Sequence, residues 1–302
     1  MRIVSLLPSA TEIVFALGLG DHLVGVTFEC DHPAEARTGR HIVVGGLDTH
    51  GLTPAAIDEL VRAKVAAGDD LYVLDETLFA QCAPDVVLTQ DLCRVCALPS
   101  GEVDAALEHL GCTADVVTLD PHTLDEVLAT IPVVAAACGV PQRGDELLAG
   151  LLARLDAVAA AVAARAAEPP RVLVIEWVEP PFLAGHWVPD LVVRAGGVPV
   201  LARPGGRSVA AAWPELVDAA GDADLVLVAP CGFGVDAAVE QAATVAERLG
   251  CDAPVWAIDA NALVVRPGPR LVDGVETIAA ILHGTGPVDP HHARRVAADE
   301  TP

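Results

Sequence analysis

Residues 142–167 read QRGDELLAGLLARLDAVAAAVAARAA, and this stretch decides how the rest of the 302-residue chain is organised. Its apolar residues recur at intervals of three and four, which predicts one amphipathic helix. They are Leu147, Leu148, Leu151, Leu152, Leu155, Val158, Ala159 and Val162. Pro141 precedes the stretch, and Pro169 and Pro170 end it. About 25 residues, each rising about 1.5 Å, make a rod of roughly 35–40 Å. Such a helix could cover one α/β domain or link two.

The two halves of the chain that flank this helix resemble each other, which favours a link between two lobes. EHLGCTADVVTLD around Cys112 resembles AERLGCDAPVWAID around Cys251. PDVVLTQDLC, which ends at Cys93, likewise resembles ADLVLVAPC, which ends at Cys231. RIVSL near the start resembles RVLVI from Arg171, although the spacing there implies a shorter second half. We interpret these matches as an internal repeat of half-chain length.

Short apolar strands alternate with amphipathic helices along most of the chain, which indicates parallel sheets covered by helices. We therefore predict an α/β fold of two similar parallel-sheet lobes joined by one long rigid helix, with a ligand cleft between the lobes. The expected boundaries are 1–140 for the N-terminal lobe, 141–168 for the connecting helix and 169–286 for the C-terminal lobe. Residues 287–302 are expected to form a flexible tail.

Charge and hydropathy limit the partners of this protein. It has 42 acidic and 18 basic residues, a net charge of −24, which argues against nucleic acid and anionic membranes. Every 18-residue apolar run contains charges, so we expect no membrane insertion. The apolar start imitates a secretory signal, but Glu12 interrupts it within a predicted helix cap. We therefore expect a cytoplasmic protein whose eight cysteines are thiols.

Polar and aromatic side chains gather where predicted strands end, and that edge of a parallel sheet is where ligands bind. The chain has only ten aromatic Phe, Trp and Tyr residues, yet three of them crowd into EWVEPPFLAGHW, residues 176–187. Flat apolar rings with a polar edge suit a large ligand, although large side chains more often form core. The candidate ligand-binding residues are Pro8, Ser9, Glu29, Gln90, Trp177, Phe182, His186, Trp187 and Phe233.

Four cysteines also fall in strand-end loops: Cys30, Cys93, Cys96 and Cys231. A Cys-x-x-Cys pair with two further thiols could hold zinc or an iron-sulfur cluster, because thiolates suit both. Inert thiols are the alternative, and redox activity lacks the helix start that would lower a thiol pKa. His32 and His186 could contribute to a metal site. The sequence contains no dinucleotide, Walker or nucleophile-elbow motif.

Three segments resemble a known family: RIVSLLPSATEIVFALGLGDHLVGVT (2–27), CAPDVVLTQ (82–90) and LDPHTLDEVLATIPVVAAACG (119–139). They are similar to class III, helical-backbone substrate-binding proteins of iron-siderophore and vitamin B12 import, cobalamin-binding proteins in particular. The resemblance implies two α/β lobes bridged by a rigid helix, a ligand clasped between them, little hinge motion and no catalysis. We expect two departures from the family, the strand-end cysteines and the absence of a signal or lipid anchor.

We therefore predict a cytoplasmic, non-enzymatic binding protein for cobalamin, another corrinoid or a similar bulky metal chelate, resembling an ABC-importer component. A transporter or a cofactor-using enzyme would be its protein partner. The alternative is a Cys-ligated zinc or iron-sulfur metalloprotein or enzyme on the same fold. A chaperone that hands a corrinoid or a metal to an enzyme is a third hypothesis.

Overall fold

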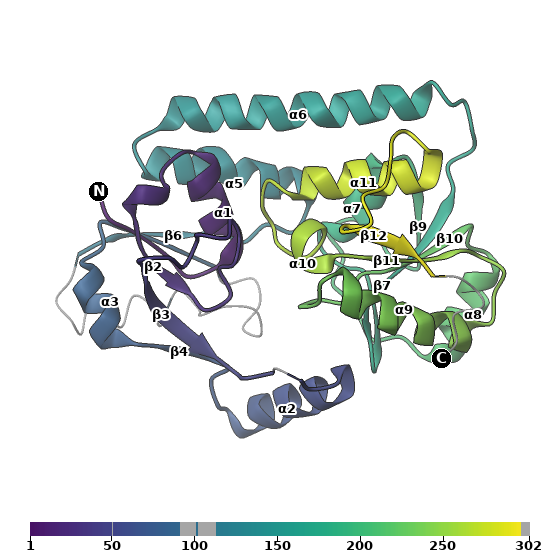
Figure 1. Cartoon of the computed structure of the whole chain (residues 1–302), viewed down its shortest axis with the longest axis horizontal. Coiled ribbons are helices and arrows are strands. Elements are labelled where there is room, and N and C mark those ends of the chain that lie inside the picture. The colour runs from purple at the N-terminus through teal and green to yellow at the C-terminus, as the bar shows by residue number, and fades with distance from the viewer. Residues whose placement is uncertain (50, 91–100, 102–112, 297–302) are drawn as a thin grey trace. The chain divides into compact units, whose positions relative to one another are not determined.

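The helices and strands of the computed structural model divide into two units (Figure 1). The structure describes residues 1–49, 51–90, 101 and 113–296. The N-terminal unit comprises Met1–Pro121 and Leu128–Gly150, and the C-terminal unit comprises His122–Val127 and Leu151–Pro302. Each unit contains a sheet in which most neighbouring strands are parallel. The predicted class, an α/β protein with two parallel-sheet lobes, is therefore confirmed.

The N-terminal sheet has the strand order β4-β3-β2-β1-β5-β6, and only β4 runs antiparallel to its neighbour. Up to β6, the described elements are β1 (Ile3–Ser5), α1 (Pro8–Ala16), a 3-10 helix (Gly20–His22), β2 (Leu23–Thr27), β3 (His41–Gly46), α2 (Pro54–Ala67), β4 (Tyr72–Leu74), α3 (Glu76–Cys82), β5 (Val86–Thr89) and β6 (Asp115–Thr118). The sequence also predicts a helix over residues 102–110, and that segment lies outside the described residues.

Local sequence explains where α2 begins and ends. Thr53 caps the helix, because its Oγ1 accepts a hydrogen bond from the backbone N–H of Ala56 at 3.3 Å. Pro54 follows as the first helical residue, where a missing N–H costs nothing. Gly68 ends the helix with a φ of +76°, a left-handed conformation that favours glycine.

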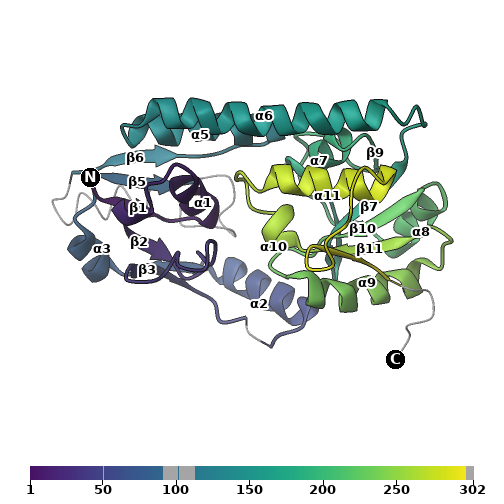
Figure 2. The ribbon, with the colours of Figure 1, turned by 45° about the horizontal axis from the view of Figure 1, so that its top comes forward.

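The C-terminal sheet has the strand order β12-β11-β10-β7-β8, and β9 also pairs with β7. Helices α7 and α11 lie on one face of this sheet, and α8 and α9 lie on the other (Figures 1 and 2). The elements are β7 (Arg171–Val178), β8 (Pro181–Leu183), α7 (Val188–Arg194), β9 (Val198–Val200), α8 (Trp213–Gly221), β10 (Leu225–Val228), α9 (Val235–Leu249), β11 (Val255–Ile258), α10 (Ala260–Leu263), α11 (Leu271–His283) and β12 (Ala293–Arg295).

Alternation along β7 puts apolar side chains on both faces of the C-terminal sheet, as expected of a buried parallel strand. Leu173 and Ile175 are fully buried in the cluster formed with α8 and α9. Val172, one residue away, is close to Gly197 on the other face, beside Leu282 of α11. Packing on both faces fixes the position of β7, and therefore the position of the residues at its carboxyl end.

The internal repeat is confirmed at the level of strand pairing. The order β2-β1-β5-β6 in one unit corresponds to β9-β7-β10-β11 in the other. Asp85 accepts a hydrogen bond from the N–H of Arg2 at 2.7 Å and donates its own N–H to Arg2 O at 2.8 Å. Asp224 and Arg171 form the same reciprocal pair at the same two distances. The matched sequences therefore build equivalent strand starts.

The long helix is α6 (Pro141–Ala163), which follows α5 (Leu124–Ala137) and ends four residues earlier than predicted. Its residues up to Gly150 belong to the N-terminal unit and those from Leu151 to the C-terminal unit, so 141–168 is not a separate region. The buried stripe is narrower than predicted. Leu151, Leu155 and Val158 are buried, but Leu152 is 42% exposed.

The C-terminal end differs from the predicted flexible tail. Residues 293–295 form β12, which pairs antiparallel with β11 at the edge of the sheet. Ala293 is only 2% exposed, and Asp259 N–H donates to His292 O at 2.8 Å. The short run ARRV carries no clear strand signal, so pairing with an existing edge decides its conformation.

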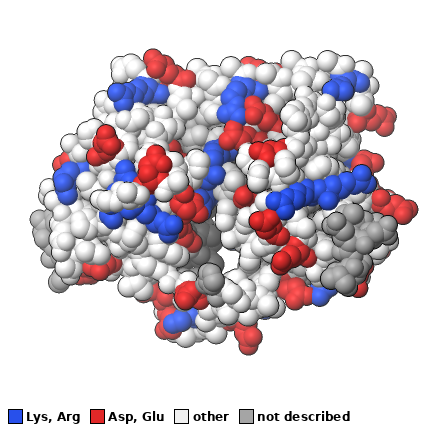
Figure 3. Space-filling view, viewed as in Figure 1, with Lys and Arg blue, Asp and Glu red and all other residues white. Residues whose placement is uncertain are grey.

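The surface shown in Figure 3 carries acidic side chains over both units, with basic side chains scattered among them. That distribution is consistent with the net charge of −24. Within the described residues, no helix combines the length and apolar character needed to cross a membrane.

Candidate functional site

The carboxyl ends of β7 and β10 lie side by side in the C-terminal unit, because the two strands are parallel neighbours with Ile175 opposite Val228. Beyond the strands the pairing continues into the loops. Ala229 N–H donates to Ile175 O, and Cys231 N–H donates to Glu176 O, both at 2.9 Å. Two segments that the sequence separates by about fifty residues therefore meet at one sheet edge.

Three aromatic side chains converge at this edge. Trp177 of β7 and Phe182 of β8 are opposite each other in an antiparallel pair, so their side chains share a face. The ring of Phe233, from the loop after β10, lies 5.8 Å from the Trp177 ring with an interplanar angle of 48°. All three side chains are partly buried and keep some exposed surface. We call Trp177, Phe182 and Phe233 the aromatic surface.

Trp187 occupies a different position from the aromatic surface. It is 7% exposed, and its indole N–H donates to Val264 O at 2.8 Å. A tryptophan whose polar atom is bonded inside the unit supports the loop that carries it. His186, immediately before it, has its ring 5.8 Å from the Trp187 ring.

Glu176 ties the two loops of this edge together. Its Oε1 accepts a hydrogen bond from Gly185 N–H at 3.1 Å, and its carboxylate also bonds the Ser208 side chain. Ser208 Oγ in turn donates to Leu183 O at 2.8 Å. Burial raises the pKa of Glu176 to about 7, although both hydrogen bonds oppose that rise. The carboxyl group therefore keeps its proton to a higher pH than an exposed glutamate does.

Gly185 allows the segments 183–187 and 205–209 to touch. A Cβ on Gly185 would lie 2.0 Å from Ser208 N and 2.6 Å from Ser208 Cα, which are both backbone atoms. The contact brings His186 N–H within 2.5 Å of Gly206 O and Gly205 N–H within 3.0 Å of His186 O. Glycine is required here because the neighbouring backbone leaves no room for a side chain.

A group of basic side chains lies on the same loops. The imidazole rings of His122 and His186 are 6.0 Å apart. Burial lowers the pKa of His186 most, and the charges of His122 and Arg207 lower it further. His186 also has a φ of +51°, so its side chain is presented from a left-handed backbone position.

The N-terminal unit places its candidate residues mostly inside. Pro8 is the first residue of α1, and Ser9 beside it is 3% exposed. Cys30 is 1% exposed, with Thr11 Oγ1 at 3.1 Å and Thr27 Oγ1 at 3.6 Å from its sulfur. Two hydroxyl groups therefore surround this thiol.

Glu29 and Gln90 lie at the carboxyl ends of β2 and β5 in the N-terminal unit, as predicted. The hydroxyl of Tyr72, the first residue of β4, donates to Glu29 Oε1 at 3.5 Å. Gln90 is 7% exposed. Of this unit's candidates, Pro8 and Glu29 therefore present the larger fraction of their surface.

The predicted four-cysteine metal site stays a prediction. Cys93 and Cys96 lie outside the described residues, while Cys30 is buried in the N-terminal unit and Cys231 is exposed in the C-terminal unit. Among the residues that the structure describes, no three or more His, Cys, Asp or Glu are placed to hold a metal ion.

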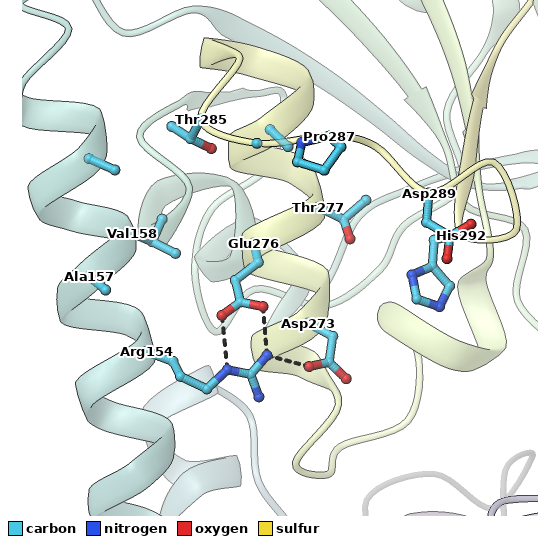
Figure 4. Close-up of a pocket in the computed structure, with 13 residues that line it drawn as sticks. Arg154, Ala157, Val158, Asp273, Glu276, Thr277, Thr285, Pro287, Asp289 and His292 are labelled. Atoms are coloured by element: carbon cyan, nitrogen blue, oxygen red, sulfur yellow. Dashed lines mark hydrogen bonds and ion pairs between the residues drawn. The ribbon is translucent and has the colours of Figure 1, made fainter.

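The C-terminal unit also contains a pocket of about 430 Å³ between α6 and α11 (Figure 4). Arg154 crosses from α6 and forms ion pairs with Asp273 and Glu276 of α11. Because its guanidinium is already bonded to two carboxylates, this arginine connects the helices and is not available to a ligand. None of the predicted site residues lines this pocket, so we place the candidate site at the sheet edge.

A long helix that contributes to two parallel-sheet units, together with a partly exposed aromatic surface at a strand carboxyl edge, defines a solute-binding protein of the helical-backbone class. Comparison with known families agrees. Residues 3–257 match the family described as periplasmic binding protein, and the chain belongs to this family. Its members are substrate-binding proteins of ABC transporters and are not enzymes, which confirms the predicted family and the predicted lack of catalysis.

Three related proteins illustrate the match. An uncharacterized ABC transporter substrate-binding lipoprotein, YvrC of Bacillus subtilis, is 25% identical over 290 residues, covering 93% of this chain and 80% of YvrC. A periplasmic heme-binding protein from Pseudomonas aeruginosa has a TM-score of 0.70 at 21% identity, covering 98% of each chain. The periplasmic vitamin B12 binding protein BtuF of Vibrio cholerae has a TM-score of 0.62 at 22% identity, covering 94% of this chain and 97% of BtuF.

Sequence reasoning missed three residues of this edge: Glu176, His122 and Arg207. Glu176 directly precedes Trp177 at the end of an apolar run, a position that could have identified it as a strand-end carboxylate. His122 and Arg207 lie in loops far from each other in sequence, and only the fold brings them to His186.

Proposed function

We propose that this protein binds cobalamin, heme or a similar bulky metal chelate and delivers it to the membrane permease of an ABC transporter. The aromatic surface formed by Trp177, Phe182 and Phe233 carries the proposal. Membership of a substrate-binding family supports the transport role, and structurally similar proteins that bind heme and vitamin B12 support the ligand class.

The chemistry of the aromatic surface fits a large flat ligand. Corrin and porphyrin macrocycles are planar, wide and apolar on their faces, so they stack on aromatic rings with a large buried area. Trp177 donates its indole N–H to Glu179 O at 2.9 Å, which fixes the ring in one orientation. Because the rings of Trp177 and Phe233 already contact each other, little side-chain freedom is lost on binding.

The test is a binding measurement with three chelates: hydroxocobalamin, hemin and a ferric siderophore. Purified protein is incubated with each, desalted and examined by absorption spectroscopy for retained ligand. We expect about one equivalent of one chelate to remain. Retention of none of the three would overturn the proposal.

A pair of variants locates the binding surface. Trp177→Leu should weaken binding about tenfold or more, since a central aromatic contact is worth roughly 2 kcal/mol. Trp213→Leu is the matched control. Trp213 is not one of the three residues of the aromatic surface: it lies at the start of α8, where Arg248 stacks over its ring. Equal losses in both variants would contradict a site at Trp177.

The cytoplasmic location expected from the sequence is a separate proposal. It is checked by fractionating cells that express the natural gene and probing each fraction with an antibody. Recovery outside the cytoplasmic fraction would refute it.

A further inference from the structure

The protein has 42 acidic and 18 basic residues, and several arginines of the C-terminal unit pair with carboxylates. Arg194 bonds Asp125 at 2.5 Å, and Arg294 bonds Asp236 at 2.7 Å. Within the described part of the chain, Arg207, His122 and His186 form no ion pair. Their side chains also form no hydrogen bond within that part of the chain, so their N–H groups are available to another molecule.

The fold holds these three residues together. Backbone hydrogen bonds join His186 to Gly206 and Gly205 to His186, so the segment with Arg207 lies against the loop with His186. His122 precedes α5, and its ring faces the His186 ring at 6.0 Å. After burial, the charges of His122 and Arg207 also lower the pKa of His186, as expected of neighbouring basic groups.

The neighbouring carboxylates are occupied by backbone donors. Glu126 accepts hydrogen bonds from the N–H groups of His122 at 2.6 Å and Thr123 at 3.2 Å. Asp190 accepts one from Leu124 N–H at 3.0 Å. Burial raises the pKa of Glu176, at the same edge, to about 7. Backbone hydrogen bonds hold Glu126 and Asp190 in place, and neither forms an ion pair with the three basic residues.

We propose that His122, His186 and Arg207 form a subsite for an anionic group of the ligand, a carboxylate or a phosphate. An oxyanion accepts hydrogen bonds from both imidazoles and from the guanidinium, which has donors in a planar fork. The subsite adjoins the aromatic surface through Glu176, which bonds the Gly185 N–H next to His186 and precedes Trp177. This inference rests on the proposed function, since it assigns a chemical class to the same ligand.

The first experiment compares ligands with and without an anionic group. Hemin is compared with its dimethyl ester, and hydroxocobalamin is compared with diaquocobinamide, which lacks the phosphate together with the rest of the nucleotide loop. The hemin pair tests a carboxylate and the corrinoid pair a phosphate. We expect the acidic member of one pair to bind at least tenfold more tightly. Equal affinity within both pairs would overturn the inference while leaving the proposed function intact.

Variants assign the effect to the subsite. Arg207→Gln should lower the affinity for the anionic ligand about tenfold and change that for its neutral counterpart less than twofold. Arg295→Gln is the control, because Arg295 is an exposed arginine of β12 in the same unit. Equal effects of Arg207→Gln on both members of a pair would refute recognition of the anionic group.

A second experiment does not depend on any chelate. Inorganic pyrophosphate is added to the protein while the imidazole signals of His122 and His186 are followed by NMR. We expect both signals to shift in the natural protein and not in Arg207→Gln. Unchanged histidine signals would refute the subsite even if a chelate binds. Shifted signals in a protein that retains no chelate would refute only the proposed function.

Discussion

Gly185→Ala is the substitution that most directly tests how this edge is built. The new Cβ would lie 2.0 Å from Ser208 N, whereas an ordinary contact is about 3.4 Å or more. The neighbouring atoms belong to the backbone of Arg207 and Ser208, so no side chain can rotate away. The two segments must therefore separate by about 1 Å or more.

That separation breaks hydrogen bonds that can be counted. His186 N–H to Gly206 O at 2.5 Å, Gly205 N–H to His186 O at 3.0 Å and Ser208 Oγ to Leu183 O at 2.8 Å all span the contact. At about 1 kcal/mol each, their loss amounts to about 3 kcal/mol of unfolding free energy. This is a large share of the roughly 5–15 kcal/mol that stabilises a typical domain.

Urea unfolding followed by tryptophan fluorescence measures the effect, because all four tryptophans lie in the C-terminal unit. Gly221→Ala is the control. A Cβ there meets nothing within 4 Å, and alanine at the end of α8 should leave stability unchanged or slightly higher. Chelate affinity should also fall in Gly185→Ala. A loss of less than 1 kcal/mol with unchanged binding would refute the argument that backbone contact positions this loop.

Three further substitutions give separate expected outcomes. The pKa of Glu176 is raised on folding from 4.5 to about 7, so the native state binds more protons and stability falls as the pH rises between those values. In urea titrations, the free energy of unfolding should decrease between pH 5 and 8 by about 2–3 kcal/mol less in Glu176→Gln than in the natural protein. The same pH dependence in both proteins would contradict this role of Glu176. Asp85→Ala and Asp224→Ala should each cost about 1 kcal/mol in calorimetry, and a difference above 2 kcal/mol would show that the repeated pairs are not equivalent. Arg154→Met should cost about 1 kcal/mol at low salt and less in 1 M salt, and a salt-independent loss would point to packing instead.

The fold was predictable from sequence because the spacing of apolar residues indicates the helices and strands, and the internal repeat indicates two similar lobes. Strands such as β5 and β10 are largely apolar runs, and four strands of each half pair in the same order. β8, β9 and β12 were missed, since three-residue strands gain their stability from the strand they pair with. The residues of such a short strand do not indicate which strand it will pair with.

The candidate site was predictable in part. Trp177, Phe182 and Phe233 were predicted from crowding and strand ends, and the structure brings their side chains together. Trp187 belonged to the same crowd, but its indole N–H bonds Val264, seventy-seven residues away, which no local pattern reveals. His122 was missed for the same reason, because only the fold shows that its ring lies next to the ring of His186.

Helix α6 has a consequence for cooperativity. Its residues 141–150 are counted with the N-terminal unit and 151–163 with the C-terminal unit, yet one hydrogen-bond ladder runs through both parts. Helical segments shorter than about 12–15 residues are marginal in water without tertiary support. When one unit opens, its part of α6 loses that support and frays toward residue 150, where it removes hydrogen-bond partners from the other part. Amide hydrogen exchange along α6 therefore registers the opening of either unit within a single element.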